Sequence, residues 1–279
     1  MTYTSLRVEH DGRIGRIVFN RPERMNALTA KAPLEFPQAI EELTLDKDVR
    51  VIIWKGDGRT FSAGFDKNVN QDEVGWHSII EEALGSREWI DGLLQIWSCP
   101  KPVIAQLHGY AVGFGGLPLL FCDLRYSSDE FKVFMAAGNT GSFLGEVWAW
   151  FIGLTAAKEF TFRPNNRLTA QELYNFGLLN RIYPLADLEQ QVEAIAAEIS
   201  RTDPVFLRMQ KIGLNRHWEI NGFRERIHAT KDIDLMLHWS PLGQANYEAL
   251  KAFGGDRRKM AQAQLQDPDY WKKLKPPPA

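Results

Sequence analysis

Apolar and polar positions alternate in short stretches along the first part of the chain. Residues 6–8 and 14–19 read as two strands on either side of Asp11-Gly12, a pattern typical of a β-hairpin. Longer apolar runs at residues 49–54 and 103–107 predict buried strands, and each run leads into a group of small residues.

Helical spacing separates the predicted strands. Thr29 can cap a helix, which Pro37 should bend because proline removes an interior hydrogen bond. The apolar face by which this helix is expected to pack against the core consists of Leu34, Phe36, Ile40 and Leu43. A later helical stripe consists of Leu188, Val192, Ile195, Ala196 and Ile199. Thr169 with Glu172 fits a capping box. Strands that alternate with helices predict an α/β fold of parallel βαβ units.

Composition narrows the class of protein. The 279 residues are 44% hydrophobic and 24% charged, which is ordinary for a globular protein. With 33 basic and 35 acidic residues, the net charge of −2 argues against a nucleic acid or an anionic membrane as the main partner. The most apolar passage, residues 109–121, is too short to span a bilayer.

The N-terminus, the two cysteines and the six histidines bear on the location of the protein in the cell and on metal binding. The first four residues lack the plan of a signal peptide, and Cys99 and Cys122 lie in apolar surroundings that suit reduced, buried thiols. We therefore expect a cytoplasmic protein. The six histidines do not cluster with acids at ligand spacing, so no metal site is expected.

Two glycine-containing segments carry the strongest chemical signal. Residues 61–66 read FSAGFD and residues 108–116 read HGYAVGFGG, and each follows a predicted strand. A strand that runs through small residues into a helix leaves free backbone N–H groups, which favour negative charge. Two such segments converging on one point would form an oxyanion hole.

These segments resemble the paired oxyanion signatures of the crotonase (enoyl-CoA hydratase/isomerase) superfamily. Residues 20–28, NRPERMNAL, are similar to the family's loop at the adenine end of coenzyme A. Residues 168–184 resemble its helix-and-strand passage, and residues 248–257 resemble its C-terminal helix. The resemblance covers residues 6–258 in the family's order.

The resemblance implies a crotonase-like spiral of ββα units over residues 1–200, which carries the oxyanion hole. Residues 201–279 would form a helical C-terminal region that supports oligomerisation, closes the pocket and ends in a flexible tail. Helix is expected from Asp203-Pro204 to about residue 266. Because the family builds trimers that often pair into hexamers, we expect a homotrimer or homohexamer.

By position, the resemblance makes the backbone N–H groups of Ala63 and Phe114 the two oxyanion donors. Phe114 stands where the family pattern has a glycine. A backbone donor survives this change if the ring turns away from the ligand. The alternative is that the ring fills the core and distorts the hole.

The acids of the family's hydratases are missing. Their positions fall on Leu117 and Ala137, neither of which can move a proton. The chain therefore resembles a divergent member that lacks both hydratase glutamates, and an ordinary hydratase is not expected.

Glu146 is the leading candidate for a relocated general acid or base. It precedes Trp148, and burial among aromatic residues would raise its pKa. The alternative is that Glu146 only favours the start of a helix. Trp148 is expected to line the acyl pocket together with Leu117 and Ala137.

Three weaker catalytic candidates each have a simpler interpretation. Asp66 suits local backbone hydrogen bonds, and His77 suits an exposed surface position. Asn139 could orient a water or a carbonyl group, or could be a turn residue.

Contacts to coenzyme A are carried over from the resemblance. They would be made by Arg24, Ala27, Lys67, Lys251 and Arg257. Coenzyme A would then be part of the substrate, with no permanently bound cofactor.

The function implied by the resemblance is that of an enzyme acting on a bulky acyl-CoA thioester. It would stabilise an enolate or a tetrahedral intermediate, as an isomerase, lyase or C–C hydrolase. Two alternatives stay open: a hydrolase of cyclic β-diketones that needs no coenzyme A, and a non-catalytic binding protein that retains the fold.

Overall fold

A computed structural model of the chain describes residues 3–66, 78–135, 143–163 and 167–275. A six-stranded sheet has the order β1-β2-β3-β4-β6-β9, and a three-stranded sheet has the order β5-β7-β8. The strands are β1 (Leu6–Asp11), β2 (Ile14–Phe19), β3 (Val51–Gly56), β4 (Val103–Leu107), β5 (Tyr110–Val112), β6 (Leu124–Ser128), β7 (Lys132–Phe134), β8 (Arg167–Thr169) and β9 (Arg181–Tyr183).

Helices surround the strands and continue beyond them. They are α1 (Ala32–Leu45), α3 (Ile79–Ser98), α4 (Leu117–Phe121), α5 (Phe143–Ile152), α6 (Leu154–Phe162), α7 (Ala170–Asn175), α8 (Leu185–Ile199), α9 (Pro204–Glu219), α10 (Phe223–His238), α11 (Pro241–Ala252) and α12 (Arg257–Gln266). Short 3₁₀ turns occur at η1 (Pro22–Arg24), η2 (Gly113–Gly116) and η3 (Tyr270–Lys273).

The predicted hairpin and the parallel core are both confirmed. β1 pairs antiparallel with β2, from Leu6 opposite Phe19 to Asp11 opposite Ile14. Gly12 in the turn has φ +58°, which glycine adopts readily. From β2 to β9, successive neighbours in the large sheet pair in parallel.

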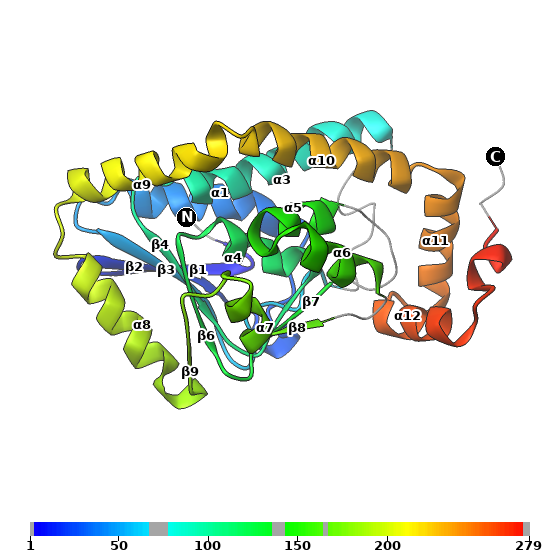
Figure 1. Cartoon of the computed structure of the whole chain (residues 1–279), viewed down its shortest axis with the longest axis horizontal. Coiled ribbons are helices and arrows are strands. Elements are labelled where there is room, and N and C mark those ends of the chain that lie inside the picture. Colours follow the sequence, from blue (N-terminus) through cyan, green and yellow to red (C-terminus); the bar gives the residue numbers. More distant parts are fainter. Residues whose placement is uncertain (1–2, 67–77, 136–142, 164–166, 276–279) are drawn as a thin grey trace.

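Both faces of the large sheet are covered, as the continuous apolar run of β3 requires. Val51 and Ile53 pack with the buried stripe of α8, whereas Ile52 and Trp54 belong to the larger core with α1 and α3. Figure 1 shows α8 on one side of the sheet and α1 and α3 on the other. Successive residues of a strand face opposite ways, so a strand buried on both faces is apolar throughout.

The first helix differs from its prediction in two details. Lys31, and not Thr29, is the N-cap residue, while the Thr29 hydroxyl lies 3.0 Å from that of Ser5. Leu34 is exposed, and Glu35 is buried instead because its carboxylate accepts the backbone N–H groups of Thr4 and Ser5. The apolar stripe could not reveal this exchange, since it depends on a hydrogen bond to the N-terminal segment.

Other local predictions hold. Thr169 and Glu172 form a reciprocal capping box at the start of α7. Cys99 and Cys122 are buried and free.

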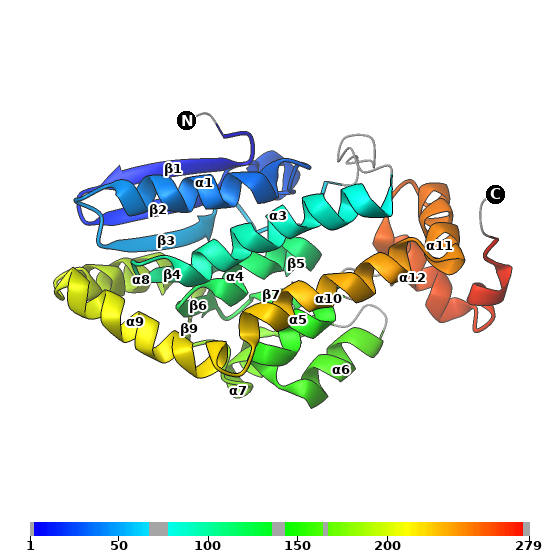
Figure 2. The same cartoon turned by 90° about the horizontal axis from the view of Figure 1, so that it is seen from above.

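The C-terminal region is helical, as predicted, through α9 to α12. Figures 1 and 2 show α10 running beside α3, with α11 and α12 beyond its far end. Among the described helices, none combines the length and the apolar character needed to cross a bilayer.

Candidate active site

The two glycine segments lie against each other. The Ser62 N–H donates to the Tyr110 carbonyl oxygen at 3.0 Å, and the Val112 N–H donates to the Ser62 carbonyl oxygen at 3.0 Å. The Phe61 N–H donates in the same way to His108. The segments that follow β3 and β4 therefore pair like short parallel strands, which confirms that they converge.

Glycine is required where the two segments are closest. Gly64 has φ +78°, and a Cβ built on it would lie 2.5 Å from the Val112 carbonyl oxygen. A Cβ on Gly115 would lie 2.8 Å from the Gly64 nitrogen and 2.9 Å from the Ser62 Cβ. Any larger residue would therefore push the segments apart.

Ala63 is not available as the first oxyanion donor. Its N–H donates to the Met25 carbonyl oxygen at 2.9 Å, and the Asp66 N–H donates to the Leu28 carbonyl oxygen at 2.9 Å. Between them, the Phe65 N–H has no acceptor among the described residues. The candidate donor therefore moves from Ala63 to Phe65, because the carbonyl oxygens of Met25 and Leu28 already accept the N–H groups of Ala63 and Asp66.

Phe114 keeps its predicted role as the second candidate donor. It is the second residue of η2, in the first turn, where N–H groups lack intrahelical partners. No acceptor for its N–H occurs in the described parts of the chain. Phe65 and Phe114 thus supply two unpaired N–H groups on segments that touch.

The Phe114 ring turns toward other aromatic rings at the edge of the core. Its centroid lies 5.1 Å from that of Phe65 and 5.5 Å from that of Trp89 on α3. The Phe65 and Trp89 rings are 5.2 Å apart, and all three side chains are half-buried. Nothing in the sequence next to Trp89 indicates this contact, because Phe65 and Phe114 are both distant in the chain.

Leu117 and Trp148 are core residues. Both side chains are almost fully buried, and the Trp148 ring packs edge-on against Phe160 at 5.4 Å. A Cβ on Gly116 would lie 3.8 Å from the Trp148 ring, so this ring supports η2 from within. Neither residue has exposed surface to offer an acyl group.

Glu146 lies on α5 and pairs with α10. Its Oε2 is 3.3 Å from Nη2 of Arg226, and its side chain is 23% exposed. Burial raises the pKa of Glu146 above its ordinary value, while the positive charge of Arg226 acts against this shift. Glu146 therefore has the raised pKa expected from the sequence, together with an ion-pair partner that the sequence did not indicate.

Asp66 and the loop of residues 20–28 form one hydrogen-bonded unit. Arg21 contacts the Asp66 carboxylate at 3.3 Å and donates to the Ala27 carbonyl oxygen at 2.6 Å. The buried Asn26, with φ 54°, donates through its side chain to the carbonyl oxygens of Asp57 and Thr60. The Asp66 carboxylate thus pairs with the Arg21 side chain, whereas the sequence suggested local backbone hydrogen bonds.

The remaining sequence candidates are scattered or lie outside the described residues. Arg24 is exposed in η1, and Ala27 is buried. Lys251 on α11 is exposed and pairs with Glu248 at 2.7 Å. Arg257 begins α12. Lys67, His77, Ala137, Asn139 and the side chain of Arg257 lie outside the described part of the structure.

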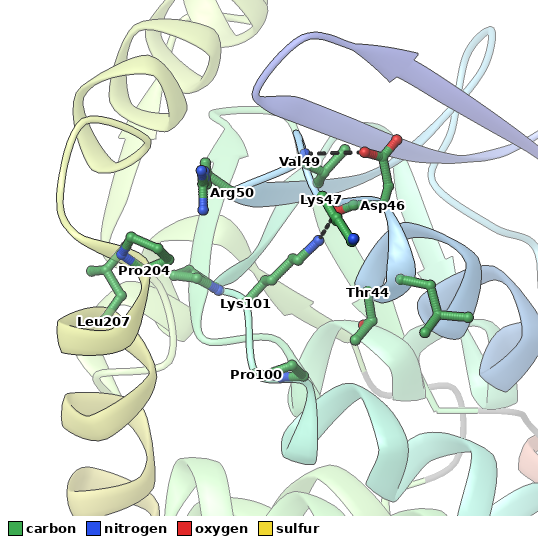
Figure 3. A pocket seen from close by; sticks show the side chains of 11 residues that line it. Thr44, Asp46, Lys47, Val49, Arg50, Pro100, Lys101, Pro204 and Leu207 are labelled. Carbon is green, nitrogen blue, oxygen red and sulfur yellow. Dashed lines mark hydrogen bonds between the residues drawn. The ribbon is translucent and has the colours of Figure 1, made fainter.

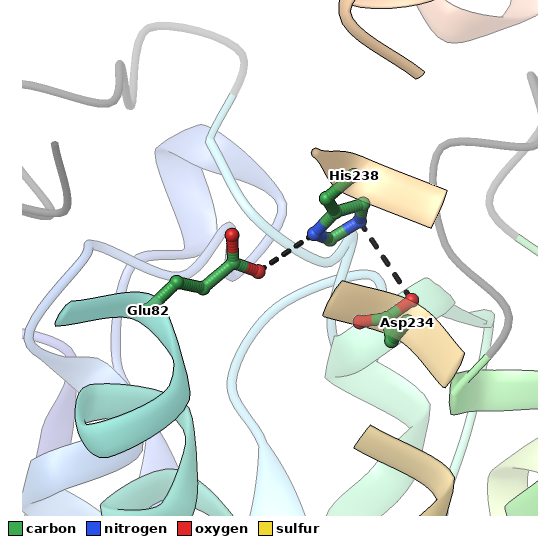
Figure 4. Close-up of side chains that lie close together, drawn as sticks. All are labelled: Glu82, Asp234 and His238. Atoms are coloured by element: carbon green, nitrogen blue, oxygen red, sulfur yellow. Dashed lines mark hydrogen bonds and ion pairs between the residues drawn. The ribbon is translucent and has the colours of Figure 1, made fainter. Parts of the chain in front are cut away.

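A buried charge network joins α3 to α10 (Figure 4). His238 Nδ1 lies 2.6 Å from Glu82 Oε1, and His238 Nε2 lies 3.7 Å from Asp234 Oδ1. Glu82 also accepts from Trp239 Nε1 at 2.8 Å. These hydrogen bonds and charges lower the pKa of Glu82 to about 2, against the opposing effect of burial.

This network brings His238 together with two acids, which the sequence analysis did not anticipate. Glu82, Asp234 and His238 could together ligate a cation. The Lys231 ammonium already lies 2.5 Å from Asp234 Oδ2 and 3.2 Å from Glu82 Oε1. Because Lys231 supplies the positive charge, the arrangement is that of an ion-pair network.

A surface cavity of about 340 Å³ lies elsewhere, at the amino ends of β3 and β4 (Figure 3). Lys101 on its wall donates to the carbonyl oxygens of Leu43 and Asp46, at 2.6 Å each, and so completes the end of α1. The glycine segments follow the carboxyl ends of the same strands, which is where parallel α/β sheets place their ligands. The cavity is therefore separate from the candidate oxyanion hole.

Comparison with known proteins agrees with this architecture. A model of the enoyl-CoA hydratase/isomerase family matches residues 9–258. An enoyl-CoA hydratase/isomerase structure from Xanthobacter autotrophicus Py2 is 27% identical, with a TM-score of 0.85, and the match covers 96% of this chain and 99% of that one. A probable enoyl-CoA hydratase from Mycobacterium smegmatis is 29% identical, with a TM-score of 0.74 over 90% and 98% of the two chains. The chain belongs to the enoyl-CoA hydratase/isomerase family, within the crotonase superfamily.

Proposed function

We propose that this protein is an enzyme that acts on an acyl-CoA thioester. The N–H groups of Phe65 and Phe114 would hold the thioester carbonyl oxygen and stabilise the negative charge of an enolate or a tetrahedral intermediate. The observation that carries this proposal is a pair of N–H groups on two touching segments that have no acceptor among the described residues. Removing one such donor typically lowers kcat by a factor of about 10² to 10³.

The reaction proposed is an isomerase, lyase or C–C hydrolase type. Leu117, at one hydratase acid position, is apolar and buried, so it neither donates nor accepts a proton. Glu146 is the group we propose for proton transfer, because burial raises its pKa toward the range useful for an acid or base at neutral pH. Arg226 would then have to release it when substrate binds.

Coenzyme A would enter as part of the substrate. Arg24 supports this proposal, since it is exposed beside the loop held by Asn26 and Arg21. Its guanidinium has no partner among the described residues, and it would bind a phosphate by charge-assisted hydrogen bonds.

The first test is a calorimetric titration with coenzyme A and a panel of acyl-CoAs, with crotonyl-CoA hydration followed in parallel. Saturable binding of acyl-CoA without hydration of crotonyl-CoA supports the proposal. Absence of binding to every coenzyme A species rejects it. Activity on free cyclic β-diketones would then indicate the hydrolase alternative. Inactivity on acyl-CoAs and on cyclic β-diketones would indicate a binding protein.

The donor role of Phe114 has a direct test. Phe114→Pro removes the N–H, and proline is tolerated in the first turn of a helix. Phe114→Ala removes the same ring but keeps the N–H. With the best-binding acyl-CoA that carries a hydrogen on its α-carbon, we expect solvent deuterium uptake at that carbon to be about 100-fold slower in the proline variant than in the alanine variant. Equal rates in the two variants would show that the Phe114 N–H is not an oxyanion donor.

A further inference from the structure

Three aromatic rings meet beside the two candidate donors. Phe65 and Phe114 carry the two candidate donor N–H groups, and their own rings lie 5.1 Å apart. Trp89 completes the group, at 5.2 Å from Phe65 and 5.5 Å from Phe114. We call Phe65, Trp89 and Phe114 the aromatic cluster.

Each ring of the aromatic cluster lies on a different backbone segment, and each segment is fixed by its own contacts. Residues 64–66 pair with Leu28 through two hydrogen bonds, which fixes Phe65. Phe114 lies in η2 between Gly113 and Gly115, both buried. Trp89 lies on α3, which approaches α1 so closely at Gly92 that a Cβ there would lie 3.1 Å from the Pro33 carbonyl oxygen. The cluster is therefore organised before any ligand binds.

Two of the three rings belong to the residues that carry the candidate donors. On the proposed function, a thioester oxygen held by the Phe65 and Phe114 N–H groups would bring its acyl carbons beside the aromatic cluster. All three rings are half-buried, so they keep apolar surface that a ligand can cover. Leu117 and Trp148, which the sequence suggested for this purpose, have no such surface.

We propose that the aromatic cluster determines acyl selectivity, and that it favours a flat, conjugated or aryl acyl group over a saturated ring of the same size. This inference rests on the proposed function. Aromatic rings attract other π systems in offset or edge-to-face contact, beyond the gain from buried area. A puckered ring offers no π face, and its axial hydrogens hold it away from the cluster.

The test compares two acyl-CoAs that differ only in the saturation of a six-membered ring, benzoyl-CoA and cyclohexanecarbonyl-CoA. By calorimetry, the wild-type protein should bind benzoyl-CoA more tightly, by a factor of about two to ten. Trp89→Leu and Phe114→Leu should each reduce this ratio toward one. Trp89→Phe, which restores an aromatic ring, should keep the preference.

Phe176→Leu is the matched control. Phe176 is 40% exposed at the end of α7 and has no aromatic contact among the described residues. This variant should keep the wild-type ratio. Equal binding of both ligands by the wild type, or a ratio that Trp89→Leu and Phe114→Leu leave unchanged, would overturn the selectivity proposal. Failure of both ligands and of coenzyme A to bind would instead reject the proposed function.

Discussion

Gly115 is the residue on which the candidate oxyanion hole depends most directly. It lies in η2 against the other glycine segment, with room for a hydrogen and for nothing larger. Side chains near the hole can turn aside, but a backbone contact at this distance cannot be relieved without moving a strand. The position is therefore sensitive to a single methyl group.

We expect Gly115→Ala to lower acyl-CoA affinity at least tenfold and to destabilise the protein by about 1–3 kcal/mol, because the methyl group overlaps Gly64 and Ser62. Gly213→Ala is the control, since a Cβ there meets nothing within 4 Å and Gly213 lies inside α9. It should stabilise the protein by about 0.5–1 kcal/mol. Urea unfolding and calorimetry give both quantities. Wild-type affinity in Gly115→Ala would contradict the proposed hole.

Glu146 has a raised pKa that predicts a small contribution to stability and, if Glu146 transfers the proton, a large contribution to activity. A carboxyl group whose pKa is raised by folding is disfavoured as an anion in the native state, so its charge contributes no stability at neutral pH. Its partner Arg226 is 57% exposed and loses little when the pair is broken.

Glu146→Gln should therefore change the free energy of unfolding by less than about 0.5 kcal/mol at pH 7. If Glu146 transfers the proton, the same variant should slow deuterium uptake at the acyl α-carbon by a factor of about 10² to 10⁴. Unfolding curves and deuterium exchange, measured on one preparation, separate the two effects. An unchanged exchange rate would assign Glu146 a purely structural pairing with α10.

The contact between α3 and α10 depends on the carboxylate of Glu82. Three donors from α10 and from its C-terminal end, on Lys231, His238 and Trp239, converge on this one buried group. Removing one partner of a buried ion pair leaves the others without compensation, which typically costs 3–5 kcal/mol. The end of α10 therefore depends on the charge state of Glu82.

This dependence predicts acid sensitivity. Because the pKa of Glu82 is about 2 in the folded protein and 4.5 ordinarily, its stabilising contribution is complete above pH 4.5 and is lost as the pH falls toward 2. Between pH 6 and pH 3 the wild type should lose about 2 kcal/mol more than Glu82→Gln. Urea unfolding at several pH values measures this difference. Glu159→Gln is the control, because it breaks only an exposed pair with Arg163, and it should lose as much stability on acidification as the wild type. The same loss in Glu82→Gln would contradict the prediction.

Elements that depend on local pattern could be predicted from the sequence, and those that depend on distant partners could not. The hairpin at Gly12 and the capping box at Thr169 follow from neighbours within a few residues. The donor at Phe65 could not be separated from Ala63, because the choice depends on which N–H groups pair with residues 25–28. The same applies to Trp89, whose role arises only from its contact with Phe114.

At the scale of the whole molecule, α9 carries apolar side chains that the described chain does not cover. The exposed apolar positions on or directly after this helix are Val205, Phe206, Met209, Ile212, Leu214 and Ile220. Exposed apolar groups on this scale mark a surface that binds another protein. Together with the family membership, they support the proposal of a homotrimer or homohexamer.

We expect light scattering after size exclusion to give three or six times the chain mass of 31.9 kDa. The double change Phe206→Ser and Met209→Ser should shift the protein toward smaller species, since it removes apolar surface from the interface. Phe162→Ser, a change at a still more exposed position on α6, should leave the mass unaltered. A monomeric wild type at micromolar concentration would contradict this prediction.

The bonding of the first glycine segment has a consequence for folding. Residues 25–28, 61–66 and 108–115 come from three distant parts of the chain, so a partly folded state that lacks their pairing also lacks the candidate oxyanion hole. A ligand of the hole then binds the native state alone, and at 100 times its Kd it stabilises the protein by about 2.7 kcal/mol. A rise in melting temperature on adding an acyl-CoA would therefore report both that the ligand binds and that these three distant segments have joined.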